Sequence, residues 1–306
     1  GAMSPLLAID LGGTHFRAAT AFAANPALVA PLENGAAPRD RATFLALLER
    51  LCAASGAERI GLGVPGLTRG TLCRWVPNLP WLDGLDLAAA LPGVTVGLGN
   101  DAQLALLAEA KAGAAMGAGD ALLVAIGTGI GSAVLASGRI IAGSGGGACS
   151  FGWATADLAD PGEDVSGWLE RHASGRALDA AASTVGLAAG EELIAAARRG
   201  DARALAALDA PATALGTALA GAVGLLDPAV IILAGGVARA LDMLGPKIQS
   251  ALDRQLPPHL RGVPLLAAHF GSSAGPVGAG LPGAAGRGLG NQSCLHSVAR
   301  KNPLPP

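Results

Sequence analysis

Short apolar runs that end in glycine alternate along this chain with longer stretches whose apolar residues recur every three or four positions. The first run, residues 6–9, contains no polar residue and predicts a buried strand. Residues 16–21 predict a second strand that returns beside it. Asp10, Gly12 and Gly13 stand between the two runs, so the chain is expected to open with a strand, a glycine turn and a strand.

The same patterns assign elements along most of the remaining chain. Apolar runs predict strands at residues 60–64, 94–98, 121–126, 133–135, 139–142, 229–233 and 265–270. Helical spacing predicts helices over residues 39–54, 86–91, 101–115, 191–199, 202–226 and 241–256, with others starting at 166 and within 271–280. Residues 65–70 are rich in turn formers, and residues 75–81 are expected to form a loop fixed by two prolines.

The segment GTGIGS at 127–132 resembles a dinucleotide-binding fingerprint, but that fingerprint must open a helix, and here a strand follows. It instead repeats the opening strand, glycine turn and strand, with Gly127 lying 115 positions (127 − 12) after Gly12. We therefore expect a duplicated α/β fold with a domain at 3–115 and a second at 116–286. The last helix could pack back on the first domain, and residues 287–306 are expected to form a frayed tail.

Composition narrows the class of protein. The 306 residues are 51% hydrophobic and 14% charged, which is typical of a compact globular protein of two domains. A formal net charge of −2 gives no reason to expect nucleic acid or an anionic membrane as a partner. The apolar stretches at 121–136 and 214–234 contain glycines, so we expect core elements rather than membrane spans. Four scattered cysteines without a CxxC pair, and no secretory signal, favour a cytoplasmic location.

The residues of the glycine turn have a chemistry of their own. Adjacent glycines such as Gly12 and Gly13 let phosphate approach backbone N–H groups. The Asp10 carboxylate would repel a bare phosphate, so it is better suited to hold Mg²⁺ or its waters. A hairpin without any ligand is the alternative. Likewise Asn100 or Asp101, which follow a predicted strand, could be no more than a helix N-cap.

Eight motifs occur in an order that identifies a known family. They are DLGGT at 10–14, GVPG at 63–66, PNLP at 77–80, NDA at 100–102, IGTGIG at 126–131 with GR at 138–139, SGRAL at 174–178, LDPAVI at 226–231 with GGV at 235–237, and AGPVGA at 274–279. Together they resemble the ROK family of sugar kinases, within the actin-like, hexokinase-like ATPases. The resemblance implies two actin-like (ribonuclease H-like) domains with an interdomain cleft, and a homodimer.

The resemblance also implies roles for particular residues. Asp101 would be the general base beside the attacking sugar hydroxyl. The nucleotide, ATP with Mg²⁺, would be bound by Asp10, Gly12, Gly13, Thr14, Thr128, Gly129, Gly235 and Gly236, with Asp10 acting on Mg²⁺ through water. Sugar would be bound by Gly66, Asn78, Asn100 and Asp101. The chemistry agrees, because phosphoryl transfer needs a positioned hydroxyl, a cation and donors on the transferred group.

One region departs from the family. Many ROK kinases have a Gly-Glu-x-Gly-His signature after the second phosphate loop, in which Glu and His bind sugar and His also binds a structural zinc. Here Ser150 and Trp153 take these places, and the cysteine cluster of the zinc site is absent, so no zinc is expected. Ser150, Trp153 and Glu170 are the remaining candidates for this side of the sugar. Trp153 could instead fill the space left by the metal, and Glu170 could be a solvated helix residue.

The function expected from these observations is ATP-dependent phosphorylation of a hexose or hexose-like sugar, in the manner of a glucokinase. A cyclitol kinase is the first alternative, because a cyclitol has no anomeric hydroxyl to lose contact with. A catalytically inactive sugar-binding relative is the second, and the presence of both Asp10 and Asp101 argues against it. A ROK transcriptional repressor is disfavoured, because too few residues precede Leu6 for a DNA-binding helix-turn-helix.

Overall fold

The computed structural model describes residues 5–22, 25–271, 275, 277–279 and 281. These residues group into two compact units, one made of the described residues within 1–119, 135–146 and 274–306 and the other of those within 120–134 and 147–273. The expected division at 115/116 lies close to the first boundary. Residues 135–146 and the described residues after 274 group with the first unit rather than with the second. The expected tail, 287–306, lies outside the described residues.

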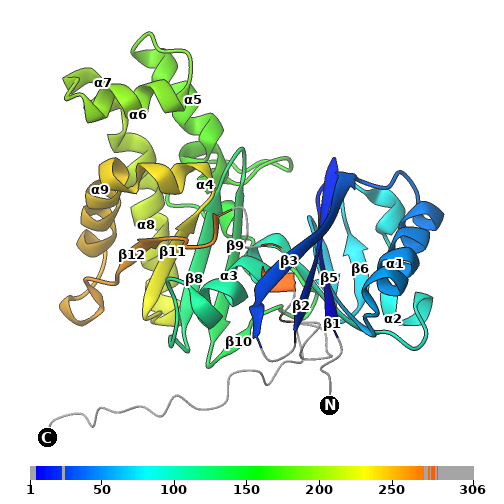
Figure 1. Ribbon diagram of the computed structural model, residues 1–306. Helices are drawn as coiled ribbons and strands as arrows, with labels where there is room; N and C mark the ends of the chain where they lie inside the picture. The colour runs from blue at the N-terminus through cyan, green and yellow to red at the C-terminus, as the bar shows by residue number, and fades with distance from the viewer. Residues whose placement is uncertain (1–4, 23–24, 272–274, 276, 280, 282–306) are drawn as a thin grey trace, which may run out of the picture. The chain divides into compact units, whose positions relative to one another are not determined.

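The first unit is built on a five-stranded sheet in the order β3-β2-β1-β4-β7 (Figure 1). Its strands are β1 (Pro5–Leu11), β2 (His15–Phe22), β3 (Asn25–Ala36), β4 (Arg59–Val64) and β7 (Thr95–Asn100). The hairpin β1–β2 is antiparallel, as its sequence predicts, whereas β1, β4 and β7 run parallel. The carboxyl ends of these three parallel strands therefore lie at the same edge of the sheet.

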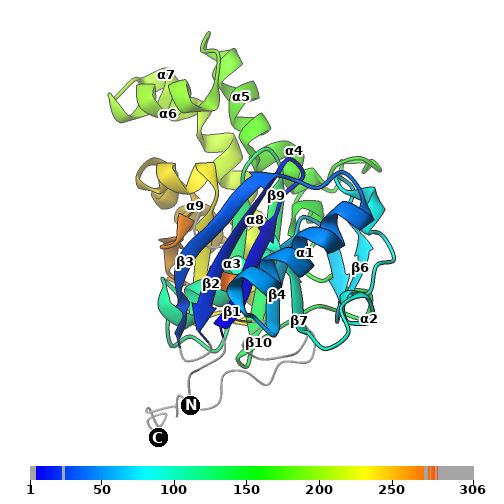
Figure 2. The same cartoon turned by 45° about the vertical axis from the view of Figure 1, so that its right-hand side comes forward.

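Helices cover both faces of this sheet. α1 (Arg41–Ser55) and α2 (Leu87–Ala90) lie on one face and α3 (Asp101–Ala112) on the other, as Figures 1 and 2 show. α1 begins at an N-cap, Asp40, and buries Phe44, Leu48 and Leu51 at the spacing that its sequence predicts. These side chains are at most 1% exposed and pack into a core with apolar residues of the strands.

Two strand regions of the first unit differ from the sequence-based expectation. Residues 65–70 are part of a hairpin, β5 (Leu67–Arg69) with β6 (Leu72–Trp75), rather than only a turn, and a short 3-10 helix, η1 (Pro80–Leu82), follows it. The other is β3, whose strand signal in the sequence is weakened by prolines. It occupies the edge of the sheet and is bulged near Pro31, and an edge position tolerates a residue without an N–H donor.

A second five-stranded sheet has the order β10-β9-β8-β11-β12, and its strands β8, β11 and β12 and most of β9 belong to the second unit. The strands are β8 (Ala121–Ile126), β9 (Ile130–Ala136), β10 (Arg139–Ile140), β11 (Val230–Ala234) and β12 (Leu265–Ala267), the last shorter than expected. β11 runs parallel to β8 and to β12, while β10 and β9 are antiparallel. Both sheets have the same strand order: three consecutive strands in reverse order, followed by two strands from later in the chain. This shared order confirms the duplicated topology.

The helices of the second unit fall into two groups. α8 (Asp209–Leu226) and α9 (Leu241–Arg254) lie together at one face of the sheet, whereas α5 (Gly175–Thr184), α6 (Gly190–Arg198) and α7 (Ala202–Ala207) gather at one end of it (Figures 1 and 2). Three further short elements are η2 (Phe151–Trp153), α4 (Trp168–Ala173) and η3 (Gly236–Ala240), and η4 (Pro258–Leu260) follows α9.

The helix expected over residues 202–226 is divided at Leu208 into α7 and α8. Pro211 lies in the first turn of α8, where a missing N–H costs no helical hydrogen bond. By length and hydropathy this stretch is the one candidate for a membrane span in the described part of the chain, but 56% of its most apolar window is buried within the protein. It forms part of the core of the second unit, as its glycine-rich sequence predicts.

Candidate functional site

Two carboxylates come together at the carboxyl edge of the first sheet. Asp10 lies near the end of β1, and Asp101 is the residue that follows β7. β4 lies between these strands and pairs with both, Gly63 being opposite Asp10 on one side and Gly99 on the other. A side chain at position 63 would contact the Asp10 carboxylate and would clash with Leu104. The parallel sheet thus brings together two acids that are far apart in the sequence.

The N-cap of α3 is Asn100 rather than Asp101. The Asn100 side-chain oxygen accepts a hydrogen bond from the Gln103 backbone N–H at 2.9 Å, and the Gln103 side chain accepts one from the Asn100 N–H at 3.2 Å. This capping box satisfies two N–H groups at the start of the helix. The alternative in which Asp101 serves only as a cap is therefore wrong, and its carboxylate is free for another purpose.

Burial and like charge perturb both acids. Asp101 is exposed as a residue, yet protein atoms crowd its carboxyl, and this loss of hydration, followed by the negative charge of Asp10, raises the pKa of Asp101 to about 7. Burial also raises the pKa of Asp10, against the opposing effect of the Arg17 guanidinium. Because the two carboxyls interact, their titrations are linked, and an acid with a pKa near 7 suits proton transfer at neutral pH.

The glycine turn beside Asp10 is closed by a hydrogen bond from the Gly12 N–H to the His15 carbonyl, at 2.8 Å. A Cβ atom on Gly13 would lie 3.0 Å from the Cβ of Asn78, so Asn78 is in contact with this turn. Thr14 is exposed, and its hydroxyl lies 2.9 Å from Nδ1 of His15. The structure therefore gathers Asp10, the glycine turn and the expected sugar ligand Asn78 within the first unit.

Two other glycines allow close approaches around this site. Gly66 lies against the backbone of Trp75 and Val76, where any side chain would clash, so the segment that leads to Asn78 depends on it. Gly275, in the last helical stretch, leaves space for the Asp10 carboxylate, since a Cβ there would lie 2.5 Å from Oδ2. The motif at 274–279 assigns no role to this glycine, and no local pattern in the sequence points to its contact with Asp10.

The second glycine turn, residues 127–129, joins β8 to β9 and is held by the helices that follow. The Gly127 N–H donates to the Gly129 carbonyl at 3.0 Å, and the Gly127 carbonyl accepts from the Gly175 N–H at 2.7 Å. Nε of Arg176 donates to the Thr128 carbonyl at 3.1 Å. Thr128 itself is exposed, so it is accessible to a ligand.

This turn borders a cavity of about 250 Å³ within the second unit. Thr128 and Gly236 both line the cavity, together with Arg176, Asp179 and Glu191 among others. Gly235 adopts a φ of +81° and packs against the carbonyl of Ile126, a position that excludes a side chain. Two of the expected nucleotide ligands, Thr128 and Gly236, therefore line the same cavity.

Ser150 directly precedes η2, and Trp153 is the last residue of η2. The Ser150 hydroxyl donates to the Gly147 carbonyl at 2.9 Å, so its proton is already used. Trp153 is 52% exposed. A tryptophan with this exposure does not fill an interior space left by a metal, so that alternative is wrong. Its sugar contact stays a prediction.

Glu170 is held against the second glycine turn. Its Oε2 accepts a hydrogen bond from the Ile130 N–H at 2.9 Å, and its Oε1 lies 3.4 Å from Nη2 of Arg176. A Cβ on Gly129 would lie 2.7 Å from Oε2. Glu170 is thus a half-buried support of the turn and not a solvated helix residue, whereas its contact with sugar stays a prediction. No local pattern indicates that Glu170 meets residues 40 positions away.

The sequence analysis predicts Mg²⁺ and excludes zinc, and both metals would be bound by acidic, histidine or cysteine side chains. No group of three or more His, Cys, Asp and Glu side chains that could hold a metal ion occurs in the described part of the chain. The absence of zinc stays a prediction. Mg²⁺ needs less from a protein, because it keeps several waters and is bound by one or two carboxylates together with substrate phosphates. The half-buried Asp10 beside a glycine turn fits such a demand.

Comparison with known proteins connects these features to a family. The ROK family model matches residues 6–281. A glucokinase of Halalkalibacterium halodurans is 30% identical over 250 residues, which cover 72% of this chain and 74% of the relative. An N-acetylmannosamine kinase of Escherichia coli is 30% identical over 292 residues, covering 90% of this chain and 97% of the relative.

A solved structure agrees. The ROK family glucokinase of Streptomyces griseus, in complex with glucose and AMPPNP, superposes with a TM-score of 0.69 at 25% identity and covers 90% of this chain and 98% of its own. These comparisons confirm the actin-like ATPase fold and the expected enzyme class, an ATP-dependent carbohydrate kinase. The chain belongs to the ROK family.

Proposed function

We propose that this chain transfers the γ-phosphoryl group of ATP to a hydroxyl of a hexose or hexose-like sugar, with Asp101 as the general base. The observation that carries the proposal is the state of Asp101. Asn100 caps α3, so the Asp101 carboxylate has no capping role, and it has a pKa of about 7 beside Asp10. A carboxylate with this pKa can take a proton from a bound hydroxyl while that hydroxyl attacks phosphorus.

The other residues have separate tasks in this proposal. Asp10 holds Mg²⁺ through water, and Mg²⁺ when bound neutralises charge on the phosphate oxygens. The backbone N–H groups of the two glycine turns that are not bonded within the turns, and the hydroxyls of Thr14 and Thr128, donate to phosphate. These nucleotide ligands are Asp10, Gly12, Gly13, Thr14, Thr128, Gly129, Gly235 and Gly236, the last two leaving room for the nucleoside.

Sugar hydroxyls are proposed to contact Asn78 and Asn100, and Gly66 keeps the Asn78 segment in place. The cap of α3 uses the Asn100 side-chain oxygen, so its amide N–H groups remain available as donors. Ser150, Trp153 and Glu170 are proposed to lie at the anomeric end of the sugar. The relatives phosphorylate different sugars, glucose and N-acetylmannosamine by their names, and both are candidates here.

A cyclitol is the second candidate substrate, and the state of Ser150 and Trp153 favours it. The Ser150 proton is bound to a carbonyl and the half-exposed Trp153 offers an apolar face, so neither demands an anomeric hydroxyl. A site without such demands loses little when that hydroxyl is missing, whereas an unpaired buried polar group costs about 1–3 kcal/mol.

The test is a coupled ADP-release assay with purified protein, ATP and Mg²⁺ over hexoses, N-acetylhexosamines and cyclitols. Turnover of a hexose with kcat/KM far above that of every cyclitol supports the main proposal, and the reverse order supports the second. The 1-deoxy analogue of the best hexose should lose less than about 30-fold in kcat/KM, equivalent to roughly 2 kcal/mol. No turnover with any member would favour an inactive sugar-binding protein.

The assembly and the location are also proposed on the resemblance. We expect a homodimer that acts in the cytoplasm, without nucleic acid or membrane as a partner. Light scattering after gel filtration measures the mass of the assembly, and a monomer at working concentration would contradict the first expectation.

A further inference from the structure

We propose that Arg171 is a positioning residue for the second glycine turn: with Asp160 and Glu163 it forms a clip that fixes α4, so that Glu170 holds residues 127–130 ready for phosphate. The inference rests on the proposed kinase function, because it gives the turn its task. The clip consists of Arg171, Asp160 and Glu163.

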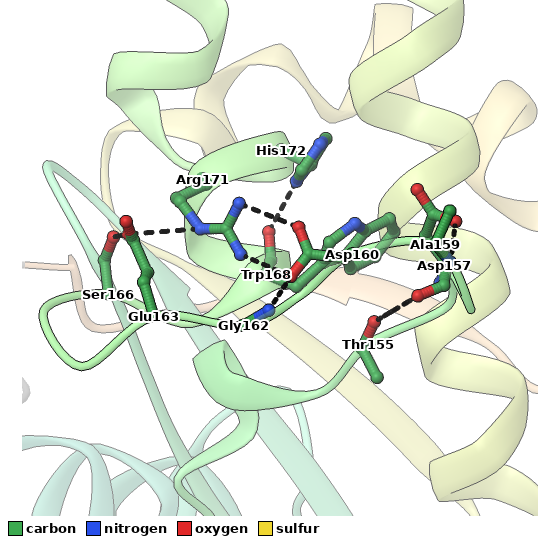
Figure 3. Close-up of polar contacts among 10 residues, drawn as sticks. All are labelled: Thr155, Asp157, Ala159, Asp160, Gly162, Glu163, Ser166, Trp168, Arg171 and His172. Carbon is green, nitrogen blue, oxygen red and sulfur yellow. Dashed lines mark hydrogen bonds and ion pairs between the residues drawn. The ribbon is translucent and has the colours of Figure 1, made fainter.

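The clip itself is a bidentate ion pair with a third partner (Figure 3). Nη2 and Nη1 of Arg171 donate to the two carboxylate oxygens of Asp160 at 2.9 and 3.0 Å, and Nε lies 3.2 Å from Oε1 of Glu163. The side chains of Arg171 and Asp160 are only 29% and 12% exposed. Two parallel N–H···O bonds between a guanidinium and a carboxylate are stronger and more directional than an ordinary surface pair.

The clip orders a segment that has no regular structure of its own. Between η2 and α4 the chain forms neither helix nor strand. Asp160 also accepts from the Gly162 N–H at 2.8 Å, and Glu163 accepts from the Ser166 hydroxyl (Figure 3). Both carboxylates therefore hold the loop and Arg171 at the same time, and the loop conformation depends on that arginine.

α4 cannot be stable by itself, since it is a helix of six residues and isolated helices of this length do not form in water. On its inner side Trp168 and Leu169 are buried, and the Trp168 ring stacks on His172 with centroids 4.5 Å apart. The Leu169 N–H also donates to the Ala154 carbonyl at 3.0 Å. The clip restrains the same helix through the loop, so α4 is held both by its buried side chains and by the ion pair.

The residue that α4 places is Glu170, which directly precedes Arg171. Its hydrogen bond to the Ile130 N–H and its contact with Gly129 hold the end of the turn. Arg176 links Glu170 to the Thr128 carbonyl. A shift of α4 would therefore move the N–H groups that are proposed to bind phosphate, and a displacement of about 1 Å in such a group can cost 10²-fold in rate.

The experiment compares Arg171→Met with Arg50→Met. Arg50 forms a bidentate pair of the same kind with Glu33, at 2.7 and 2.8 Å, on the surface of the first unit, where the two side chains are 57% and 36% exposed, and it has no part in the proposed site. Hydrogen–deuterium exchange is followed in a peptide containing Ile130, and the Kd for AMPPNP is measured by calorimetry. We expect Arg171→Met to expose the Ile130 amide to faster exchange and to weaken AMPPNP about 10-fold or more, while Arg50→Met changes neither.

Arg171→Lys keeps the charge but cannot form the bidentate pair, so an intermediate effect on both measurements is expected. If Arg171→Met does not fold, Asp160→Asn takes its place, because it weakens the pair and leaves Glu163 to hold Arg171. Unchanged exchange at Ile130 in the folded variants overturns the proposal. Faster exchange with an unchanged Kd for AMPPNP also overturns it, since the clip would then be structural only. Neither measurement needs turnover, so a failed sugar screen would not be mistaken for a failed clip.

Discussion

Asp10 and Asp101 interact electrostatically at the carboxyl edge of one parallel sheet, although they lie 91 positions apart in the chain (101 − 10 = 91). The interaction and the crowding of Asp101 act in the same direction, and both favour the protonated acid. A parallel sheet makes this pairing possible, because every strand ends at the same edge whatever its order in the sequence.

The first prediction concerns Asp101→Asn. The amide keeps the size of the side chain and can still hydrogen-bond a sugar hydroxyl, but it cannot accept a proton. We expect kcat to fall about 10²–10⁴-fold with a much smaller change in sugar affinity. The control is Asp209→Asn, since Asp209 is the first residue of α8 as Asp101 is of α3. Near-normal turnover of Asp101→Asn would remove Asp101 from the mechanism.

The pH dependence of the reaction is the second prediction. Only the ionised form of Asp101 can act as base, so activity should fall on the acid side of its pKa of about 7. We expect kcat/KM for the sugar to decrease about tenfold for each pH unit below that value. The measurement is a kcat/KM profile from pH 5 to 9 at saturating ATP. A profile that stays flat down to pH 5 would show that a base of ordinary carboxylate pKa, or none, is at work.

The third prediction is that the general base lowers the stability of the fold. A folded pKa of about 7 against an ordinary value of 3.8 means that the native state binds more protons than the unfolded state between these pH values. Ionised Asp101 therefore destabilises the native state increasingly as pH rises from about 4 to 7, and Asn relieves this. We expect Asp101→Asn to have the wild-type Tm at pH 4 and a higher Tm at pH 8. The same Tm difference at both pH values would contradict this linkage.

Gly275 provides the fourth prediction. Gly275→Ala would place a Cβ against the Asp10 carboxylate and force it to move, so we expect a loss of kcat of about 10-fold or more, in keeping with the cost of small displacements at a reacting centre. Gly221→Ala is the matched control. Gly221 lies inside α8 with nothing within 4 Å of the added Cβ, and alanine there should raise stability by up to about 1 kcal/mol. Equal kcat values in the two variants would contradict the proposed constraint on Asp10.

The last prediction is that the purified protein contains no zinc. Structural zinc sites use four Cys or His ligands, and the expected ligand positions of this family are occupied by Trp153 and by residues without thiols. The segment between η2 and α4 is held instead by the ion pair of Arg171 with Asp160. Elemental analysis after dialysis is the measurement. Zinc retained at one ion per chain would contradict the prediction and show that the region from Cys149 to Glu170 is wrongly aligned with the family's zinc motif.

Much of the architecture could be predicted from local patterns. The apolar run before Asp10, the glycines after it and the returning strand specify a hairpin without reference to any distant residue, and Gly127 repeats the arrangement. The sequence also predicted α1 through the spacing of Phe44 and Leu48. It did not predict β3, because a proline-containing edge strand is stabilised by its neighbour β2 rather than by its own sequence.

The sequence by itself therefore determined the duplicated fold, the family and the candidate residues, since each depends on residues that are close together in the chain. Only the tertiary structure decided between Asn100 and Asp101 as the cap of α3, coupled Asp10 to Asp101, and assigned Glu170 to the Ile130 N–H. The reason is that the pKa of a carboxyl and the partner of a side chain are set by the atoms around them in space. Those atoms come from strands and helices whose distance along the chain carries no information about their contact.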